Sequence, residues 1–94
     1  MKGLFVKNCS PTREGWYIVR YNGNAKQFWG LYVPKTAENP EHWLLAVPAY
    51  FTYHCLIYKK FNDVEWMPSS YADPYDCPLG GVYLNGAYSS GAYV

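Results

Sequence analysis

The chain has 94 residues and a mass of 10.8 kDa, enough for one small domain and too short for a dinucleotide-binding enzyme, an α/β barrel or a kinase. Half of the residues are hydrophobic and 20% are aromatic, whereas only 16% are charged, and this composition excludes an intrinsically disordered chain. The net charge of +1 gives no overall preference for nucleic acid or for a membrane surface.

Extended segments and turn signals alternate along the first third of the chain. Residues 4–6 are a short strand candidate, and the aromatic and β-branched residues 16–21 are a second. The pair Asn22 and Gly23 follows directly, and both residues accept the positive φ of a type I′ hairpin turn. The return strand is expected over residues 26–33, where Gly30 either leaves room for a cross-strand aromatic ring or marks a bulge.

Residues 40–47 fit two different structures. Asn39 and Pro40, followed by an acidic residue, are typical of the start of a helix, which Pro48 would end. The same stretch is also apolar enough to be a buried strand. We favour the strand, because a strand-rich chain supplies it with a partner, and the short helix stays open as the alternative.

The second half continues the strand pattern and then changes in character. A long strand is expected over residues 50–59, a turn over 61–63 and a short strand over 64–67, which Pro68 ends. From residue 69 on, tyrosine and glycine dominate, and residues 82–84 and the pair Asn85 and Gly86 indicate one further hairpin.

These elements together predict a mainly β protein. We expect a small twisted antiparallel sheet, or a partly closed barrel, of about five strands, with a short helix near residues 40–47 as the variant. Residues 1–94 are expected to form a single domain, with a β core over 1–68 and a Tyr/Gly-rich C-terminal segment over 69–94.

The charges divide unevenly between the two parts of the chain. Residues 1–60 carry a net charge of +5, whereas residues 61–94 carry −4 and contain no basic residue. One interpretation is a polar surface that is spread unevenly along the chain. The other is an acidic, tyrosine-bearing tail that docks on a basic groove.

No combination of reactive side chains predicts catalysis or metal binding. The three cysteines, Cys9, Cys55 and Cys77, are odd in number and contain no C-x-x-C pair, which argues against a disulfide framework and a zinc module. His54 and Cys55 are neighbours on a strand, so their side chains point to opposite faces and cannot form a dyad. We therefore predict a protein that is not an enzyme and that needs no cofactor or metal.

Neither a signal peptide nor a membrane span is expected. The apolar run over residues 3–6 is too short for the hydrophobic part of a signal peptide. Residues 43–58 contain no charge but are fewer than the roughly 20 residues that a spanning helix needs. A soluble, cytoplasmic protein is the expectation.

Aromatic residues are more numerous than a core of this size needs. Eleven tyrosines and four tryptophans exceed what so small a core can bury with every polar tip satisfied, so some rings should be exposed and available for binding. The alternative is that these rings are packing material for a thin sheet. The candidate partner-binding residues lie in the C-terminal segment and are Tyr71, Asp73, Tyr75, Asp76, Tyr83 and Tyr88.

Two motifs resemble segments of known phage proteins. G-W-Y-I-V-R at residues 15–20 resembles the G-W-Y-x-V-R opening of many short proteins encoded by tailed phages and prophages. V-E-W-M-P at residues 64–68 is similar to the V-x-x-W-M-P closing segment of a related group of small phage proteins of unknown function. The chain departs from that group after Pro68, where a proline-rich end is usual. The resemblance implies phage origin and no particular activity.

Phage accessory proteins of this size often bind a host protein, including CRISPR effectors. We accordingly expect a non-enzymatic inhibitor that binds a host defence or regulatory protein. That host protein is a candidate nucleic-acid-binding protein. The alternatives are a small protein that sequesters a nucleotide signal between aromatic rings and a minor virion component. No membrane partner and no direct contact with nucleic acid are expected, and a homodimer stays open.

Overall fold

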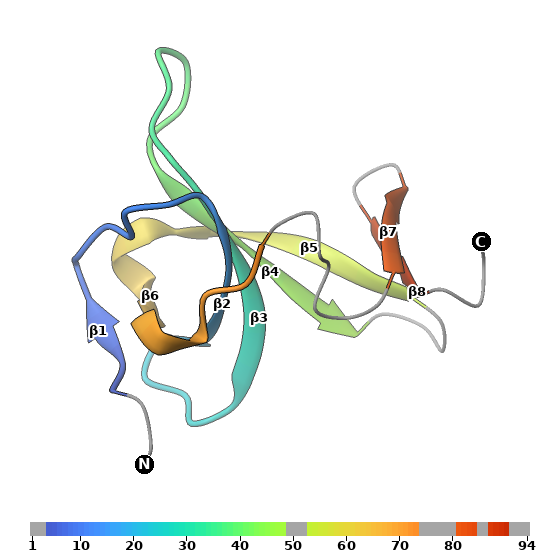
Figure 1. Cartoon of the computed structure of the whole chain (residues 1–94), viewed down its shortest axis with the longest axis horizontal. Coiled ribbons are helices and arrows are strands. Elements are labelled where there is room, and N and C mark those ends of the chain that lie inside the picture. Colours follow the sequence, from blue (N-terminus) through green and yellow to red (C-terminus); the bar gives the residue numbers. More distant parts are fainter. Residues whose placement is uncertain (1–3, 49–52, 74–80, 85–86, 91–94) are drawn as a thin grey trace.

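The computed structural model describes residues 4–48, 53–73, 81–84 and 87–90 (Figure 1). The protein is mainly β, and the helices within these ranges are single 3-10 turns, η1 (Phe61–Asp63) and η2 (Pro68–Ser70). The strands are β1 (Val6–Lys7), β2 (Gly15–Tyr21), β3 (Gln27–Val33), β4 (His42–Pro48), β5 (Tyr53–Lys60), β6 (Val64–Trp66), β7 (Gly81–Leu84) and β8 (Ala87–Ser90).

All described strands join one antiparallel sheet in the order β1-β6-β2-β3-β4-β5-β8-β7. Strands β2 to β5 follow one another as a meander, and η1 then carries the chain from the end of β5 to β6, which pairs with β2 and β1. Figure 1 shows the sheet curling around its own concave side. The twisted antiparallel sheet is thus confirmed, and its edges stay open. The described residues form eight strands rather than about five, because the N-terminal strand candidate and both strands of the expected C-terminal hairpin all join the sheet, as β1, β7 and β8.

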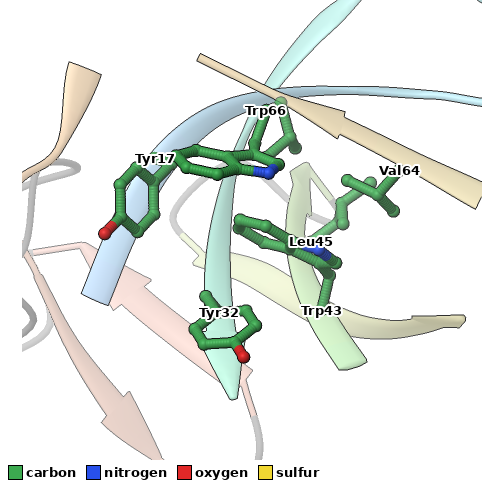
Figure 2. Close-up of a cluster of buried hydrophobic side chains, with 7 residues drawn as sticks. Tyr17, Tyr32, Trp43, Leu45, Val64 and Trp66 are labelled. Atoms are coloured by element: carbon green, nitrogen blue, oxygen red, sulfur yellow. The ribbon is translucent and has the colours of Figure 1, made fainter. Parts of the chain in front are cut away.

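The concave face of this curl holds the core. Alternate residues of β2, β3, β4 and β6 point into it, and the rings and branched side chains meet at its centre (Figure 2). The ring centroids of Tyr17 and Trp66 lie 5.1 Å apart in an edge-to-face arrangement, which the aromatic quadrupole favours. The cluster, at most 6% exposed at any position, consists of Tyr17, Val19, Tyr32, Trp43, Leu45, Val64 and Trp66.

Gly30 makes this dense packing possible. It lies in the middle of β3 between Tyr17 and Leu45, its register partners on the neighbouring strands. A Cβ atom at Gly30 would lie 2.9 Å from both methyl groups of Val19 and 3.3 Å from Cε3 of Trp43. The space left by the missing side chain is therefore filled by a branched side chain and an aromatic ring, as one of the two sequence interpretations predicted.

The ambiguous segment around residues 40–47 forms strand β4, so the strand prediction is confirmed and the helix alternative is wrong. β4 pairs along its length with β3 on one side and β5 on the other. Trp43 and Leu45 alternate into the core, which is the period of two that a strand imposes. Two partner ladders and this burial outweigh the helix-start signal of Asn39 and Pro40.

The first hairpin also follows its sequence signal. Asn22 and Gly23 both have positive φ, 54° and 76°, and Asn24 N–H donates to the Tyr21 carbonyl at 3.0 Å to close the turn. The paired strands are β2 and β3, in the register Arg20 with Gln27.

Substituting Gly23 by valine is expected to destabilise the domain by about 1–3 kcal/mol. A β-branched residue resists the positive φ that this position requires, although no neighbouring atom lies within 4 Å to obstruct a side chain. Urea denaturation measures the loss. Gly23→Asn, a residue that tolerates this conformation, is the control and should lose less than half as much. If both variants lost the same free energy of unfolding, the positive φ at position 23 would not be the cause of the loss.

The segment after β6 continues along β2. Met67 N–H donates to the Ile18 carbonyl at 3.0 Å, and Ala72 exchanges two backbone hydrogen bonds with Trp16. Between these contacts η2 bulges away, and the Ser70 hydroxyl accepts the Ile18 N–H at 2.7 Å. A side chain thereby replaces the strand neighbour that β2 lacks at this point, and residues 64–72 are fixed to the core sheet.

The remaining boundaries differ from the predictions by a few residues. The long strand covers Tyr53–Lys60, the expected turn after it is the 3-10 turn η1, and β1 begins at Val6. The expected C-terminal hairpin is present as β7 and β8, with Leu84 paired to Ala87. Its predicted tip, Asn85 and Gly86, lies outside the described residues.

Candidate protein-binding surface

The outer edge of β5 is only partly used by the sheet. β4 pairs with β5 from His54 to Lys60, but β8 covers the opposite edge of β5 only from Tyr53 to Cys55. In the part of the chain that the structure describes, no strand pairs with residues 56–60 on that edge. Ile57 and Tyr58, on opposite faces of this stretch, are 38% and 51% exposed. Within the described ranges, the outer edge at the end of β5 thus has no strand partner and lies beside apolar side chains.

Tyr58 is held in a defined orientation by its neighbour on β4. The His42 ring stacks on the Tyr58 ring with centroids 4.8 Å apart and planes 28° from parallel. His42 Nδ1 lies 2.9 Å from the Pro40 carbonyl oxygen, and because a carbonyl only accepts, Nδ1 carries the hydrogen in this contact. One face of the Tyr58 ring is therefore fixed by the protein, and its remaining surface is open.

A shallow pocket adjoins this ring at the end of β5. Its volume is about 380 Å³. Two aromatic rings and a proline form the apolar part of the wall, and an ammonium, an amide and a carboxylate form the polar part. The lining residues are Pro40, Glu41, Tyr58, Lys60, Phe61 and Asn62.

The Glu41 carboxylate accepts hydrogen bonds from two other side chains of the protein. Its two carboxylate oxygens accept the Ser10 hydroxyl at 2.9 and 3.1 Å, and one of them accepts the Tyr32 hydroxyl at 2.5 Å. Burial, followed by the hydrogen bond to Glu41, raises the pKa of Tyr32 to about 12. This carboxylate ties the loop that carries Ser10 to the core sheet, and the cation of Lys60 is the charge that the pocket presents.

The free energy of unfolding is expected to fall as the pH rises from about 10 to about 12. An unfolded tyrosine ionises near pH 10, whereas folded Tyr32 keeps its proton until about pH 12. The contribution of Tyr32 is thus fully present below pH 10 and is lost as the pH passes 12. Tyr32→Phe should make this decline shallower in urea denaturation series. Val64→Ala is destabilising but keeps every tyrosine, so its free energy of unfolding should fall with pH as steeply as that of the wild type. If Val64→Ala also showed a shallower decline, lower stability alone would explain the result for Tyr32→Phe.

The candidate residues of the C-terminal segment lie in two places. Tyr71 is half-buried, its ring centroid 5.2 Å from that of Tyr17 and 3.9 Å from the guanidinium carbon of Arg13. Asp73 is exposed next to the Trp16 bridge at Ala72. Both belong to the segment that follows β2, so Tyr71 packs against the core side of the sheet.

The other candidates are at or beyond the opposite edge. Tyr83 and Tyr88 are register partners in β7 and β8, and Tyr88 is in turn the register partner of His54 on β5. Tyr75 and Asp76 lie outside the described residues. The structure thus brings Tyr83 and Tyr88 to the edge of β5 and separates them from Tyr71 and Asp73 by the strands β3 and β4.

The cysteines form no cross-link in the described ranges. Cys9 is exposed and Cys55 is half-buried, both with free thiols, and Cys77 lies outside those ranges. Within the same ranges no three acidic, histidine or cysteine side chains gather as metal ligands. None of the described helices has the length and apolar character to cross a bilayer.

Sequence reasoning missed the exposed edge of β5. The signal was present, since residues 50–59 are apolar on both faces and are followed by Lys60. A strand that is apolar on both faces is typical of the buried centre of a sheet. Exposure of Ile57 and Tyr58 depends on where β8 stops along β5, which no local pattern encodes.

Comparisons of the chain with protein-family models, with curated proteins and with solved structures found no match.

Proposed function

We propose that the protein is a non-enzymatic, phage-encoded inhibitor that binds a host defence or regulatory protein, such as a CRISPR effector, in the host cytoplasm. The observation that carries the binding role is the exposed stretch of β5 with Ile57 and Tyr58. The phage origin and the kind of target rest on the resemblance of residues 15–20 and 64–68 to phage proteins.

The composition of this surface suits a protein partner. Tyrosine is enriched among the residues that dominate protein interfaces, because it supplies a large contact area with few rotatable bonds. Tyr58 is already oriented by His42, so little side-chain entropy is lost when a partner covers it. Lys60 and Asn62 give the polar rim that surrounds such an anchor.

The proposed surface continues onto the C-terminal strands. β8 and β7 extend the sheet from the same edge of β5, and they bring the backbone positions of Tyr83 and Tyr88 next to it. We therefore include these two tyrosines, from the sequence-based set, in the binding surface.

The proposal is tested with tagged protein as bait in a lysate of a candidate bacterial host, followed by an activity assay of the captured complex once purified. We expect Tyr58→Ala to lower the affinity for the purified target by at least tenfold while the melting temperature stays within a few degrees. Leu4→Ala, at a side chain that is 81% exposed, is the control and should bind like wild type. A captured target that stays fully active at saturation would contradict the inhibitor role.

One observation favours a second candidate, a protein that sequesters a nucleotide. The pocket places the Tyr58 and Phe61 rings beside the Lys60 ammonium, which is suitable for a planar base with an attached phosphate. Chromatography of the extract from denatured protein should then release a nucleotide in stoichiometric amount, and Lys60→Glu should abolish it. Protein that yields no nucleotide after purification from infected cells would exclude this candidate.

A further inference from the structure

We propose that the outer edge of β5, from residue 56 to residue 60, binds an extended segment of a partner protein as an added antiparallel strand, with acidic side chains opposite Lys60. This inference rests on the proposed function, because it names the part of a protein partner that the β5 surface recognises.

The first support is that this edge already accepts a strand. β8 pairs with β5 in the antiparallel direction, with Tyr53 opposite Ser89 and Cys55 opposite Ala87. Among the described residues the pairing with β8 covers β5 no further, whereas β5 continues as a regular strand to Lys60 and stays paired with β4 on its other side (Figure 1). Residues 56–60 span roughly 17 Å, the length of a typical short strand.

The second support is the contrast with the edge at β1. That strand has only two residues, and one of them is the exposed Lys7. A very short edge strand is one of the usual means by which proteins limit pairing at a sheet edge, because it leaves little backbone for an added strand. The described end of β5 instead exposes Ile57 on one face and Tyr58 on the other. An added strand would cover both side chains and pair the free backbone groups between them.

The third support is charge, and it selects the partner. Among the described residues the ion pair is Arg20 with Glu65, and Lys60 takes no part in one. Lys59 points to the other face, where its ammonium lies 4.0 Å over the Tyr21 ring. The nearby Glu41 is occupied by the hydroxyls of Ser10 and Tyr32. Lys60 is therefore the cation available to a ligand.

A second copy of the protein would fit this edge less well. Two β5 edges aligned antiparallel over residues 56–60 would place Lys60 of each copy opposite Leu56 of the other, so neither Lys60 would gain a carboxylate partner. An extended peptide with acidic residues at its N-terminal end would place them opposite Lys60 and its apolar residues beside Ile57 and Tyr58. The occupant that the edge favours is thus an acidic, extended segment of another protein.

The test uses a fluorescein-labelled peptide of sequence Glu-Glu-Val-Thr-Val-Thr-amide and the full chain. We expect fluorescence anisotropy to show saturable binding. The peptide with the reversed order Thr-Val-Thr-Val-Glu-Glu should bind at least tenfold more weakly, because antiparallel pairing then places its acidic end away from Lys60. Of two peptides N-methylated on alternate residues, one should lose at least tenfold and the other should bind like the parent, since only every second amide faces β5.

Variants of the protein complete the design. Lys60→Glu should reverse the preference toward a Lys-Lys-Val-Thr-Val-Thr peptide, and Ile57→Lys, at a side chain that is already partly exposed, should reduce binding at least tenfold without loss of fold. Lys26→Glu, at an exposed lysine in the first hairpin, is the charge-matched control and should bind normally.

Three results would overturn the proposal: no saturable binding, equal binding of all N-methylated peptides, or a dimer in sedimentation experiments that Ile57→Lys converts to monomers. The assay contains no host protein, so its failure is distinct from that of the proposed function. A captured host target that still binds the Ile57→Lys variant would support the function and contradict the strand addition.

Discussion

Replacing Trp43 with alanine is expected to remove most of the stability of this domain. The Trp43 side chain is 0% exposed, and its ring centroid lies 5.3 Å from that of Tyr32, 5.9 Å from Tyr17 and 6.3 Å from Trp66. Truncating a buried tryptophan costs about 3–5 kcal/mol, and domains of this size have about 5–15 kcal/mol in total. Near-ultraviolet circular dichroism and urea denaturation should show a largely unfolded or barely folded chain.

A tryptophan on the other face of the sheet provides the matched control. Trp29 is half-buried, and Trp29→Ala should cost less than half as much as Trp43→Ala. Trp43→Phe should recover part of the loss, because it restores a ring among Tyr17, Tyr32 and Trp66. If the two alanine variants had similar stability, the concave cluster would not be the dominant core.

The second large effect is expected from Gly30→Val. A Cβ atom alone would meet both Val19 methyl groups at 2.9 Å, and Trp43 prevents relief in the other direction. Overpacking of this kind typically costs about 1–3 kcal/mol, and two further methyl groups place valine at or above the upper end. Thermal unfolding should show a clear decrease in melting temperature, with Gly30→Ala intermediate between wild type and Gly30→Val.

The cause of that loss can be checked by a double-mutant cycle. Val19→Ala removes the two methyl groups that obstruct position 30, so the combination of Gly30→Ala with Val19→Ala should be more stable than the sum of the single losses predicts. Strict additivity would mean that the glycine is needed for its backbone and not for the space beside it.

The parts of the fold that were predictable are those that local chemistry determines. Asn22 and Gly23 accept positive φ, and the strands on either side of them pair as expected. The prediction of a strand for residues 43–47 depended on one non-local assumption, that partner strands lie on either side. The structure provides these partners, since β4 pairs with both β3 and β5. The pairing of β6 with both β1 and β2 joins segments far apart in sequence, and no periodicity within the chain encodes it.

The candidate surface was less predictable than the fold. Composition indicated that some aromatic rings must be exposed, but it pointed to the C-terminal tyrosines rather than to Tyr58. Tyr71 illustrates the difficulty, since its ring stands between Tyr17 and the Arg13 guanidinium although it belongs to the Tyr/Gly-rich segment. Exposure is decided by which strand ends where, and this is a property of the assembled sheet.

The route of the chain from β5 through η1 to β6 also determines when the core can close during synthesis. Trp66 donates its Nε1 hydrogen to the Cys9 carbonyl, a contact between residues 57 apart, and the Ser70 hydroxyl bonds Ile18 across 52 residues. The meander of β2 to β5 consists of near neighbours and can pair as soon as it leaves the ribosome, but one side of its aromatic cluster stays uncovered until residues 64–72 emerge. The nascent chain therefore carries an open hydrophobic face until residues 64–72 have left the ribosome, and the arrival of these residues closes the aromatic core.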